Sequence, residues 1–229
     1  MTEYLIALIE GVTPAADEQA RLMDARAAWT AQLEKEGALR DTERLRDSHE
    51  GRRVHRVGNT VHVEQGPFTE PLASYWAVSA EDLEAAVALA KRLPVLPGDT
   101  VEVRPIMKGS HDPKKTDKTG KVFAFEVLGN APNEEAWIRL MNRIDAETDN
   151  HATRDFISGL RLEAPRTGRR LVTQQGRTVV LDGPFPESKE VIGGLFFMRL
   201  PSLEDAVAWV STLAYVGIGA TEIREVWRS

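Results

Sequence analysis

The sequence of 229 residues contains no cysteine, and this absence excludes disulfide bonds, thiolate metal sites and cysteine nucleophiles. It also lacks an apolar run of the roughly 18 to 20 residues that a membrane-spanning helix requires. The first residues show neither the basic segment nor the cleavage site of a signal peptide. We therefore expect a cytoplasmic protein with no membrane partner.

The short motifs of several enzyme classes are also missing. The chain has no Gly-Lys-Ser/Thr phosphate loop, no Gly-x-Gly-x-x-Gly after a strand, no Gly-x-Ser-x-Gly and no His-Glu-x-x-His. These absences argue against nucleotide hydrolysis, dinucleotide cofactors, serine-hydrolase chemistry and zinc-peptidase chemistry. We expect no cofactor and no bound metal.

Clustered positive charge is confined to one segment of a chain whose formal net charge is −6 at pH 7. Residues 108–121 hold five lysines among Gly, Ser, Thr, Asp and Pro residues, a composition typical of a solvated tether. A nucleic-acid-binding face would instead combine a basic surface with aromatic residues on which bases stack. We interpret 108–121 as a linker and expect no nucleic-acid partner.

What the sequence does contain is a duplication. Gly-Arg-Arg occurs at 51–53 and again at 168–170, and Gly-Pro-Phe occurs at 66–68 and again at 183–185. The motifs keep their order in both halves, which is the pattern of an internal repeat.

The duplication predicts one domain at 1–107 and a like domain at 122–229, each of a size that supports its own core. Two homologous domains usually pack about a pseudo-twofold axis, as the subunits of a homodimer do. We therefore expect a ligand cavity between the domains. Whether the whole chain pairs again as a homodimer stays open.

Both copies show the same order of expected elements: strand, helix, hairpin, strand, helix, strand. In the first copy these are a strand at 3–10, a helix at 15–36, a hairpin of 52–57 with 60–64, a strand at 74–78, a helix capped by Ser79 and a strand at 101–106. In the second copy they are a strand at 121–128, a helix from about 133 to 158, a hairpin of 169–174 with 178–181, a strand at 195–200, a helix capped by Ser202 and a strand at 222–227. Two helices on one face of a mostly antiparallel sheet make an α+β domain.

The hairpin of the first copy brings two histidines together. A two-residue Gly-Asn turn pairs His55 with His62 and Arg53 with Glu64, all on the face turned away from the helices. The imidazoles could supply acid–base groups or two nitrogen ligands. No third ligand follows from the spacing, and a solvated polar face is the alternative interpretation.

Paired arginines open each hairpin. Because successive side chains of a strand point to opposite faces, only one arginine of each pair can reach a given pocket. Guanidinium groups bind carboxylates bidentately. We take Arg53 and Arg170 as candidate contacts for an anionic part of a substrate.

The Gly-Pro-Phe loop of the second copy follows Asp182 and precedes Glu187 and Lys189. In a structural interpretation Asp182 accepts backbone hydrogen bonds, the glycine permits a tight bend and Phe185 fills the core. In a functional interpretation Asp182 and Lys189 transfer protons, while Phe185 and Glu187 contact the substrate.

The Asp-Gly-Pro-Phe run at 182–185, with Glu187, Lys189 and the Gly-Gly pair at 193–194, resembles the signature loop of the YCII-related, or DGPF-domain, family. The resemblance covers both copies, although Gln65 replaces the motif Asp in the first. It implies tandem ferredoxin-like α+β domains that form a dimeric α+β barrel within one chain. Family members include an enzyme that dehydrochlorinates a chlorinated hydroxyquinol and proteins encoded beside alternative sigma factors.

Two hypotheses of different class follow. The first is a cofactor-free lyase or isomerase that acts on a small polar or aromatic metabolite in the inter-domain cavity, with Asp182, Lys189, His55 and His62 as catalytic residues. The second is a non-catalytic module that binds a small-molecule ligand or regulates a sigma-factor stress response. The resemblance also implies a histidine on the first helix, which with an aspartate is the usual proposal for acid–base chemistry in the broader family. The first helix of the first copy has no histidine, which favours the second hypothesis.

Overall fold

The structure is a computed structural model that describes residues 1–11, 15–111, 120–129, 134–151, 155–174, 177–185, 191–213, 216 and 219–228. The first copy contains β1 (Thr2–Ile9), α1 (Ala16–Lys35), β2 (Leu39–Arg44), β3 (Arg52–Val57), β4 (Thr60–Gln65), β5 (Leu72–Ala80), α2 (Leu83–Ala90) and β6 (Thr100–His111). The second copy contains β7 (Val122–Gly129), α3 (Glu134–His151), β8 (Phe156–Leu162), β9 (Arg169–Gln174), β10 (Arg177–Asp182), β11 (Val191–Arg199), α4 (Leu203–Ser211) and β12 (Gly219–Glu225). The expected mixed α+β fold with a mostly antiparallel sheet is confirmed.

The chain folds into two compact units, and each unit contains the hairpin of the other copy. The first unit comprises Met1–Arg44, Thr69–Ile106 and Pro165–Phe185, and therefore includes the β9–β10 hairpin. The second unit comprises Leu45–Phe68, Met107–Ala164 and Pro186–Ser229, and therefore includes the β3–β4 hairpin. The two hairpins are thus exchanged between the repeats.

The two units share one strand order. In the first unit the antiparallel order is β2-β5-β1-β6-β9-β10. In the second it is β8-β11-β7-β12-β3-β4. This is the same order, because each strand of one unit is replaced in the other by the corresponding strand of the other copy. In the part of the chain that the structure describes, neither set of strands closes on itself, so the expected barrel is not confirmed.

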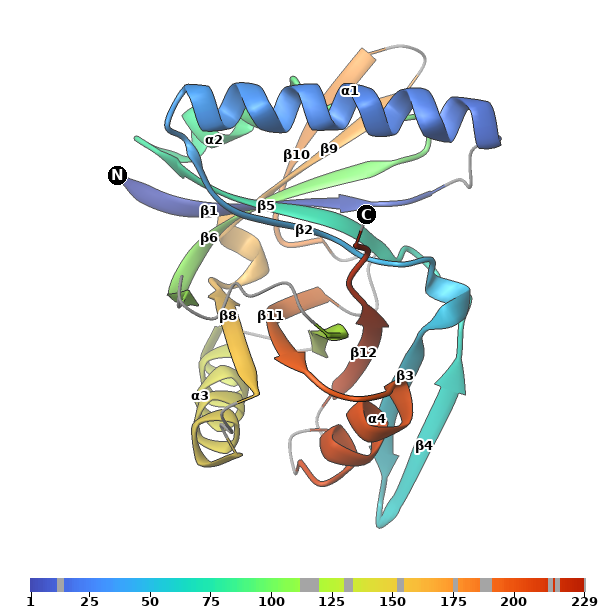
Figure 1. Cartoon of the computed structure of the whole chain (residues 1–229). Coiled ribbons are helices and arrows are strands. Elements are labelled where there is room, and N and C mark those ends of the chain that lie inside the picture. Colours follow the sequence, from blue (N-terminus) through green and yellow to red (C-terminus); the bar gives the residue numbers. More distant parts are fainter. Residues whose placement is uncertain are drawn as a thin grey trace. The chain divides into compact units, whose positions relative to one another are not determined.

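Each unit buries an apolar core between its helices and its sheet, and Figure 1 shows α1 and α2 on one face of the first unit's sheet. In the first unit the ring of Trp29 in α1 meets that of Trp76 in β5 edge-on, with centroids 5.0 Å apart. In the second unit Phe125 of β7 stacks on Phe196 of β11 at 4.7 Å. Because side chains alternate along a strand, the polar residues between these aromatic ones point to the opposite face.

Several sequence expectations need correction. The helix expected at 133–158 ends at His151, and β8 follows as a strand that the sequence analysis missed, as it also missed β2. Ser79 does not cap a helix, because it lies within β5; Asp82 caps α2 by accepting a hydrogen bond from the backbone N–H of Ala85. The N-cap expected at Ser202 is confirmed.

The segment interpreted as a linker is described only at its two ends. Strand β6 continues to His111, and residues 112–119 lie outside the described part of the chain. Among the described residues, no helix combines the length and the apolar character needed to cross a membrane.

Candidate functional site

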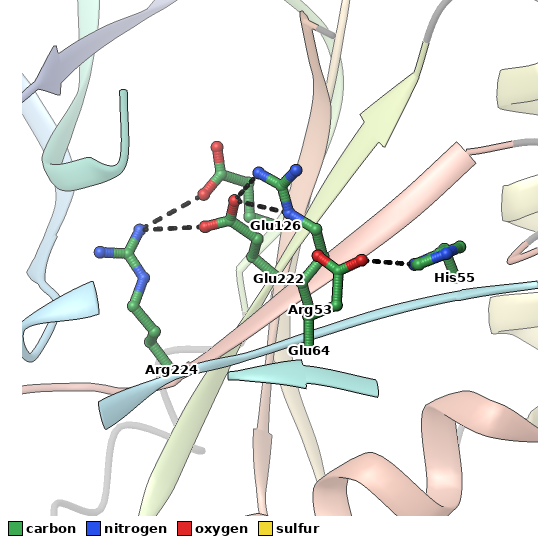
Figure 2. A network of polar contacts seen from close by, with 6 residues as sticks. All are labelled: Arg53, His55, Glu64, Glu126, Glu222 and Arg224. Carbon is green, nitrogen blue, oxygen red and sulfur yellow. Dashed lines mark hydrogen bonds and ion pairs between the residues drawn. The ribbon is translucent and has the colours of Figure 1, made fainter. Parts of the chain in front are cut away.

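Charged side chains form a row across adjacent strands of the second unit. Glu126 on β7 lies opposite Glu222 on β12, Glu222 lies opposite Arg53 on β3, and Arg53 lies opposite Glu64 on β4. Residues that face each other in an antiparallel ladder project from the same side of the sheet. These four side chains, which we call the polar row, therefore lie side by side on one face (Figure 2).

Two guanidinium groups bind the two inner carboxylates of the polar row. Arg53 donates through Nε to Oε1 of Glu222 at 3.2 Å, and its Nη2 also contacts that oxygen. Arg224, two residues beyond Glu222 on β12, places Nη2 3.4 Å from Oε2 of Glu126 and 4.0 Å from Oε2 of Glu222. Glu126, Glu222 and Arg224 are each at most 4% exposed, so water screens these charges weakly.

Glu126 differs from an ordinary surface carboxylate in proton affinity. Burial and then the negative charge of Glu222 raise the pKa of Glu126, Arg224 and Arg53 oppose the rise, and the net result is a pKa of about 8. Glu126 therefore carries a proton at neutral pH. A carboxylic acid kept protonated by its surroundings can donate a hydrogen bond or a proton where an ordinary glutamate cannot.

The two histidines lie in the neighbouring row of the same face. The expected pairing of His55 with His62 is confirmed, and their rings stack with centroids 5.2 Å apart and planes 11° apart. Nδ1 of His55 lies 3.8 Å from Oε1 of Glu64. Among the described residues, no group of three or more His, Cys, Asp or Glu side chains could hold a metal ion.

The first unit lacks most of these polar groups at the corresponding positions. Its equivalent row is Ala7, Glu102, Arg170 and Leu181, and its neighbouring row includes Thr100, Val172 and Val179. Ala7 replaces Glu126, Leu181 replaces Glu64, and two valines replace the two histidines. The fold therefore forms without these four polar residues. The paired Glu and Arg are common to both units, and so is the second arginine, because Arg104 lies 3.2 Å from Glu102 as Arg224 lies beside Glu222.

The signature loop contributes to the first unit. Asp182 ends β10, is mostly exposed and lies 2.8 Å from Nε of Arg169. Phe185 is buried, and the guanidinium carbon of Arg170 lies 4.3 Å from its ring centroid. Arg170 in turn binds Glu102 at 2.9 Å.

The residues predicted from the sequence are divided between the units. Asp182, Phe185 and Arg170 belong to the first unit, and His55, His62 and Arg53 belong to the second. Glu187 and Lys189 lie outside the described residues. The catalytic and substrate-binding roles of all these residues stay predictions.

Sequence reasoning named none of Glu126, Glu222 and Arg224 as a candidate site residue. A signal for Glu126 was available, because it is a single charged residue within the apolar strand Val-Phe-Ala-Phe-Glu-Val-Leu. Charged residues are rarely buried without a partner, so a charge within such a strand indicates a polar network.

A comparison with protein families identifies the chain. The model of the YCII-related domain matches it twice, over residues 4–110 and 114–229. The chain therefore belongs to the YCII-related family and contains two tandem copies of the domain. A search of the curated proteins returned no match.

Proposed function

We propose that this YCII-related protein is a cofactor-free enzyme of the lyase or isomerase type, which moves a proton on a small polar or aromatic metabolite at the polar row of the second unit. The observation that carries the proposal is the contrast between the units. Glu126, Glu64, His55 and His62 occupy positions where the first unit has apolar side chains in the same fold. Polar groups that the fold does not require, gathered on one face, are candidates for function.

The polar row offers both partners of a proton transfer. Glu126, protonated at neutral pH, is the proton donor, and Glu222, held by Arg53 and Arg224, is the carboxylate beside it. A carboxyl group with a raised pKa beside a second carboxyl group is an arrangement typical of acid–base catalysis.

Substrate contact is assigned to the more exposed end of the row. The side chains of Arg53, His55 and Glu64 are 21%, 28% and 56% exposed, whereas the carboxylate pair is buried. A ligand that approaches from this end meets a guanidinium group that can bind an anionic or polar group, and two imidazoles whose ring nitrogens can donate or accept hydrogen bonds. Asp182 and Lys189 have no part in this version of the proposal.

Deuterium incorporation tests the proposal even while the substrate is unidentified. The full chain is incubated in D₂O with mixtures of small metabolites, and mass spectrometry detects compounds that gain deuterium or change structure. We expect turnover with the wild-type protein and its loss in Glu126→Gln and His55→Gln. Glu102→Gln alters the buried carboxylate of the first unit, which corresponds to Glu222, and should keep the activity.

Circular dichroism establishes that each variant is folded. Wild-type turnover that persists undiminished in both Glu126→Gln and His55→Gln would remove the polar row from the reaction. Absence of exchange with every metabolite class would remove the enzymatic proposal itself.

A second candidate function is a ligand-binding or regulatory module without turnover, including a role beside a sigma factor. The burial of Glu126, Glu222 and Arg224 favours it, because a buried ion network can be structural. Native mass spectrometry separates the two functions: a retained small molecule or a bound sigma factor, together with no deuterium exchange, supports the module.

A further inference from the structure

Both Gly-Pro-Phe loops place a phenyl ring on the arginine that binds the buried glutamate. In the second unit the guanidinium carbon of Arg53 lies 5.0 Å from the ring centroid of Phe68, and the same guanidinium binds Glu222. The first unit repeats this arrangement with Arg170 on the ring of Phe185 at 4.3 Å. The chain thus contains two copies of one contact, although the two hairpins differ elsewhere in sequence.

The backbone of each loop is held in place before its phenylalanine. The Gly66–Pro67 and Gly183–Pro184 peptide bonds are both cis. The N–H of Gly66 donates to the carbonyl of Gly51 at 3.4 Å, and a Cβ on Gly66 would overlap the carbonyl oxygen of Ser48. This close approach of two backbone segments requires glycine, and it fixes the point from which the phenylalanine side chain starts.

An aromatic face affects a guanidinium group in two ways. The attraction between the cation and the ring stabilises the contact by roughly 0.5 to 2 kcal/mol, depending on how far it is desolvated. The contact also restricts an otherwise flexible side chain, so that less conformational entropy is lost when the arginine binds a carboxylate. A ring in this position therefore selects the orientation in which Arg53 reaches Glu222.

We propose that Phe68 is a positioning residue whose ring holds the guanidinium of Arg53 against Glu222, so that this cation stays beside the buried carboxyl pair of Glu222 and Glu126. Phe68 acts through Arg53, and the proposal assigns no contact between its ring and a substrate. The phenylalanine of the first Gly-Pro-Phe loop then has a role in setting the proton affinity of a buried carboxyl group in the same unit.

The groups around Glu126 determine the direction of the expected effect. Glu222 and Arg224 face it from β12, Arg53 is the next residue of the row on β3, and the residue opposite on β11 is Leu195, which does not titrate. The positive charge of Arg53 lowers the pKa of Glu126. If the guanidinium of Arg53 moves away, the carboxyl pair of Glu126 and Glu222 loses a neighbouring cation. Glu126 should then release its proton at a higher pH.

The titration of a buried carboxylic acid can be followed directly. Infrared difference spectroscopy of the full-length protein detects the C=O band of a protonated carboxyl group, and loss of this band in Glu126→Gln assigns it. In Phe68→Leu, which removes the aromatic face, we expect the band to titrate about half a pH unit or more above the wild-type midpoint. Phe68→Tyr keeps the ring and should restore the wild-type midpoint.

Phe185→Leu is the matched control, because it removes the same contact in the unit where Ala7 replaces Glu126. It should leave the band unchanged. Phe68→Met, of similar volume, replaces Phe68→Leu if the latter does not fold. An unchanged midpoint in a folded Phe68→Leu or Phe68→Met protein, or an equal shift in Phe185→Leu, overturns the proposal. The measurement needs no substrate, so its outcome is independent of the proposed enzymatic function.

Discussion

Glu126 and Glu222 lie directly opposite each other on β7 and β12, and both are almost completely buried. Two buried carboxylates at this spacing cannot both be ionised without strong repulsion, even with Arg53 and Arg224 beside them. Ala7 occupies the equivalent position in the first unit, opposite Glu102. The second carboxylate is therefore a feature of one unit, and its proton is the property that experiments can address first.

The pH dependence of stability should change when Glu126 is replaced. Folding raises the pKa of Glu126 from its ordinary value of 4.5 to about 8, so the folded state binds this proton more tightly than the unfolded state does. The protonated carboxyl group of Glu126 contributes to the free energy of unfolding. This contribution is fully present below the pKa of the unfolded state and is lost as the pH rises through the pKa of the folded state. Relative to Glu126→Gln, the wild-type protein should thus lose stability between about pH 4.5 and pH 8.

Chemical denaturation of both proteins across this pH range measures the effect. The difference in the free energy of unfolding should grow to the order of a few kcal/mol and level off above the folded pKa. All other titrating groups are common to both proteins and cancel to first order. Parallel stability curves for the two proteins would contradict the raised proton affinity of Glu126.

Arg53 and Glu222 should be energetically coupled. Arg53→Met leaves a buried carboxylate with one cation fewer, and we expect a loss of about 3 kcal/mol in the free energy of unfolding. Replacing both partners, as Arg53→Met with Glu222→Leu, removes the buried charge as well and should cost less than the sum of the single changes. A double-mutant cycle by urea denaturation measures this coupling, and additive losses would show that the contact contributes little.

The exchange of hairpins between the copies can be tested by cross-linking, because the chain has no native cysteine. Thr100 on β6 lies opposite Val172 on β9, so cysteines at both positions should oxidise to a disulfide and stabilise the protein by about 2 to 4 kcal/mol. Mass spectrometry of the oxidised protein, before and after reduction, detects the bond.

His55 provides the control for this experiment. It corresponds to Val172 in the other hairpin, and it would lie opposite Thr100 if each copy kept its own hairpin. Cysteines at 55 and 100 should therefore remain reduced under the same conditions. Ready oxidation of that pair instead of the first would mean that the hairpins are not exchanged.

The signature glycines should be far less replaceable than a turn glycine. A Cβ added at Gly66 or Gly183 would overlap the carbonyl oxygen of Ser48 or Pro165, so Gly→Ala at either position should lower stability by about 2 kcal/mol or more. Gly58 has a positive φ of 58° but open space around it, and Gly58→Ala should cost only about 1 to 2 kcal/mol. Thermal melts rank the three variants; a Gly66→Ala protein as stable as wild type would rule out the close approach.

Local sequence patterns were sufficient where one short segment determines the geometry. The turn after Val57 sets the register of β3 against β4, and the pairing of His55 with His62 follows from counting outward from it. The strands β2 and β8 were missed because neither contains a continuous apolar run: β2 reads Leu-Arg-Asp-Thr-Glu-Arg, and Ser158, Gly159 and Arg161 interrupt β8. Ser79 was mistaken for a cap because Ser and Asp are both good N-caps and only three residues separate it from Asp82.

The sequence by itself determined the duplication, the mixed α+β class, the hairpin register and the family, because repeats, periodicity and turn chemistry are properties of neighbouring residues. Only the tertiary structure decided which copy each hairpin joins and which charges meet. Arg53 and Glu222 are 169 positions apart, and Glu126 and Arg224 are 98 apart. Contacts over such separations form when whole sheets assemble around their cores, and this assembly, not local pattern, places Glu126 beside Glu222 and gives it a proton at neutral pH.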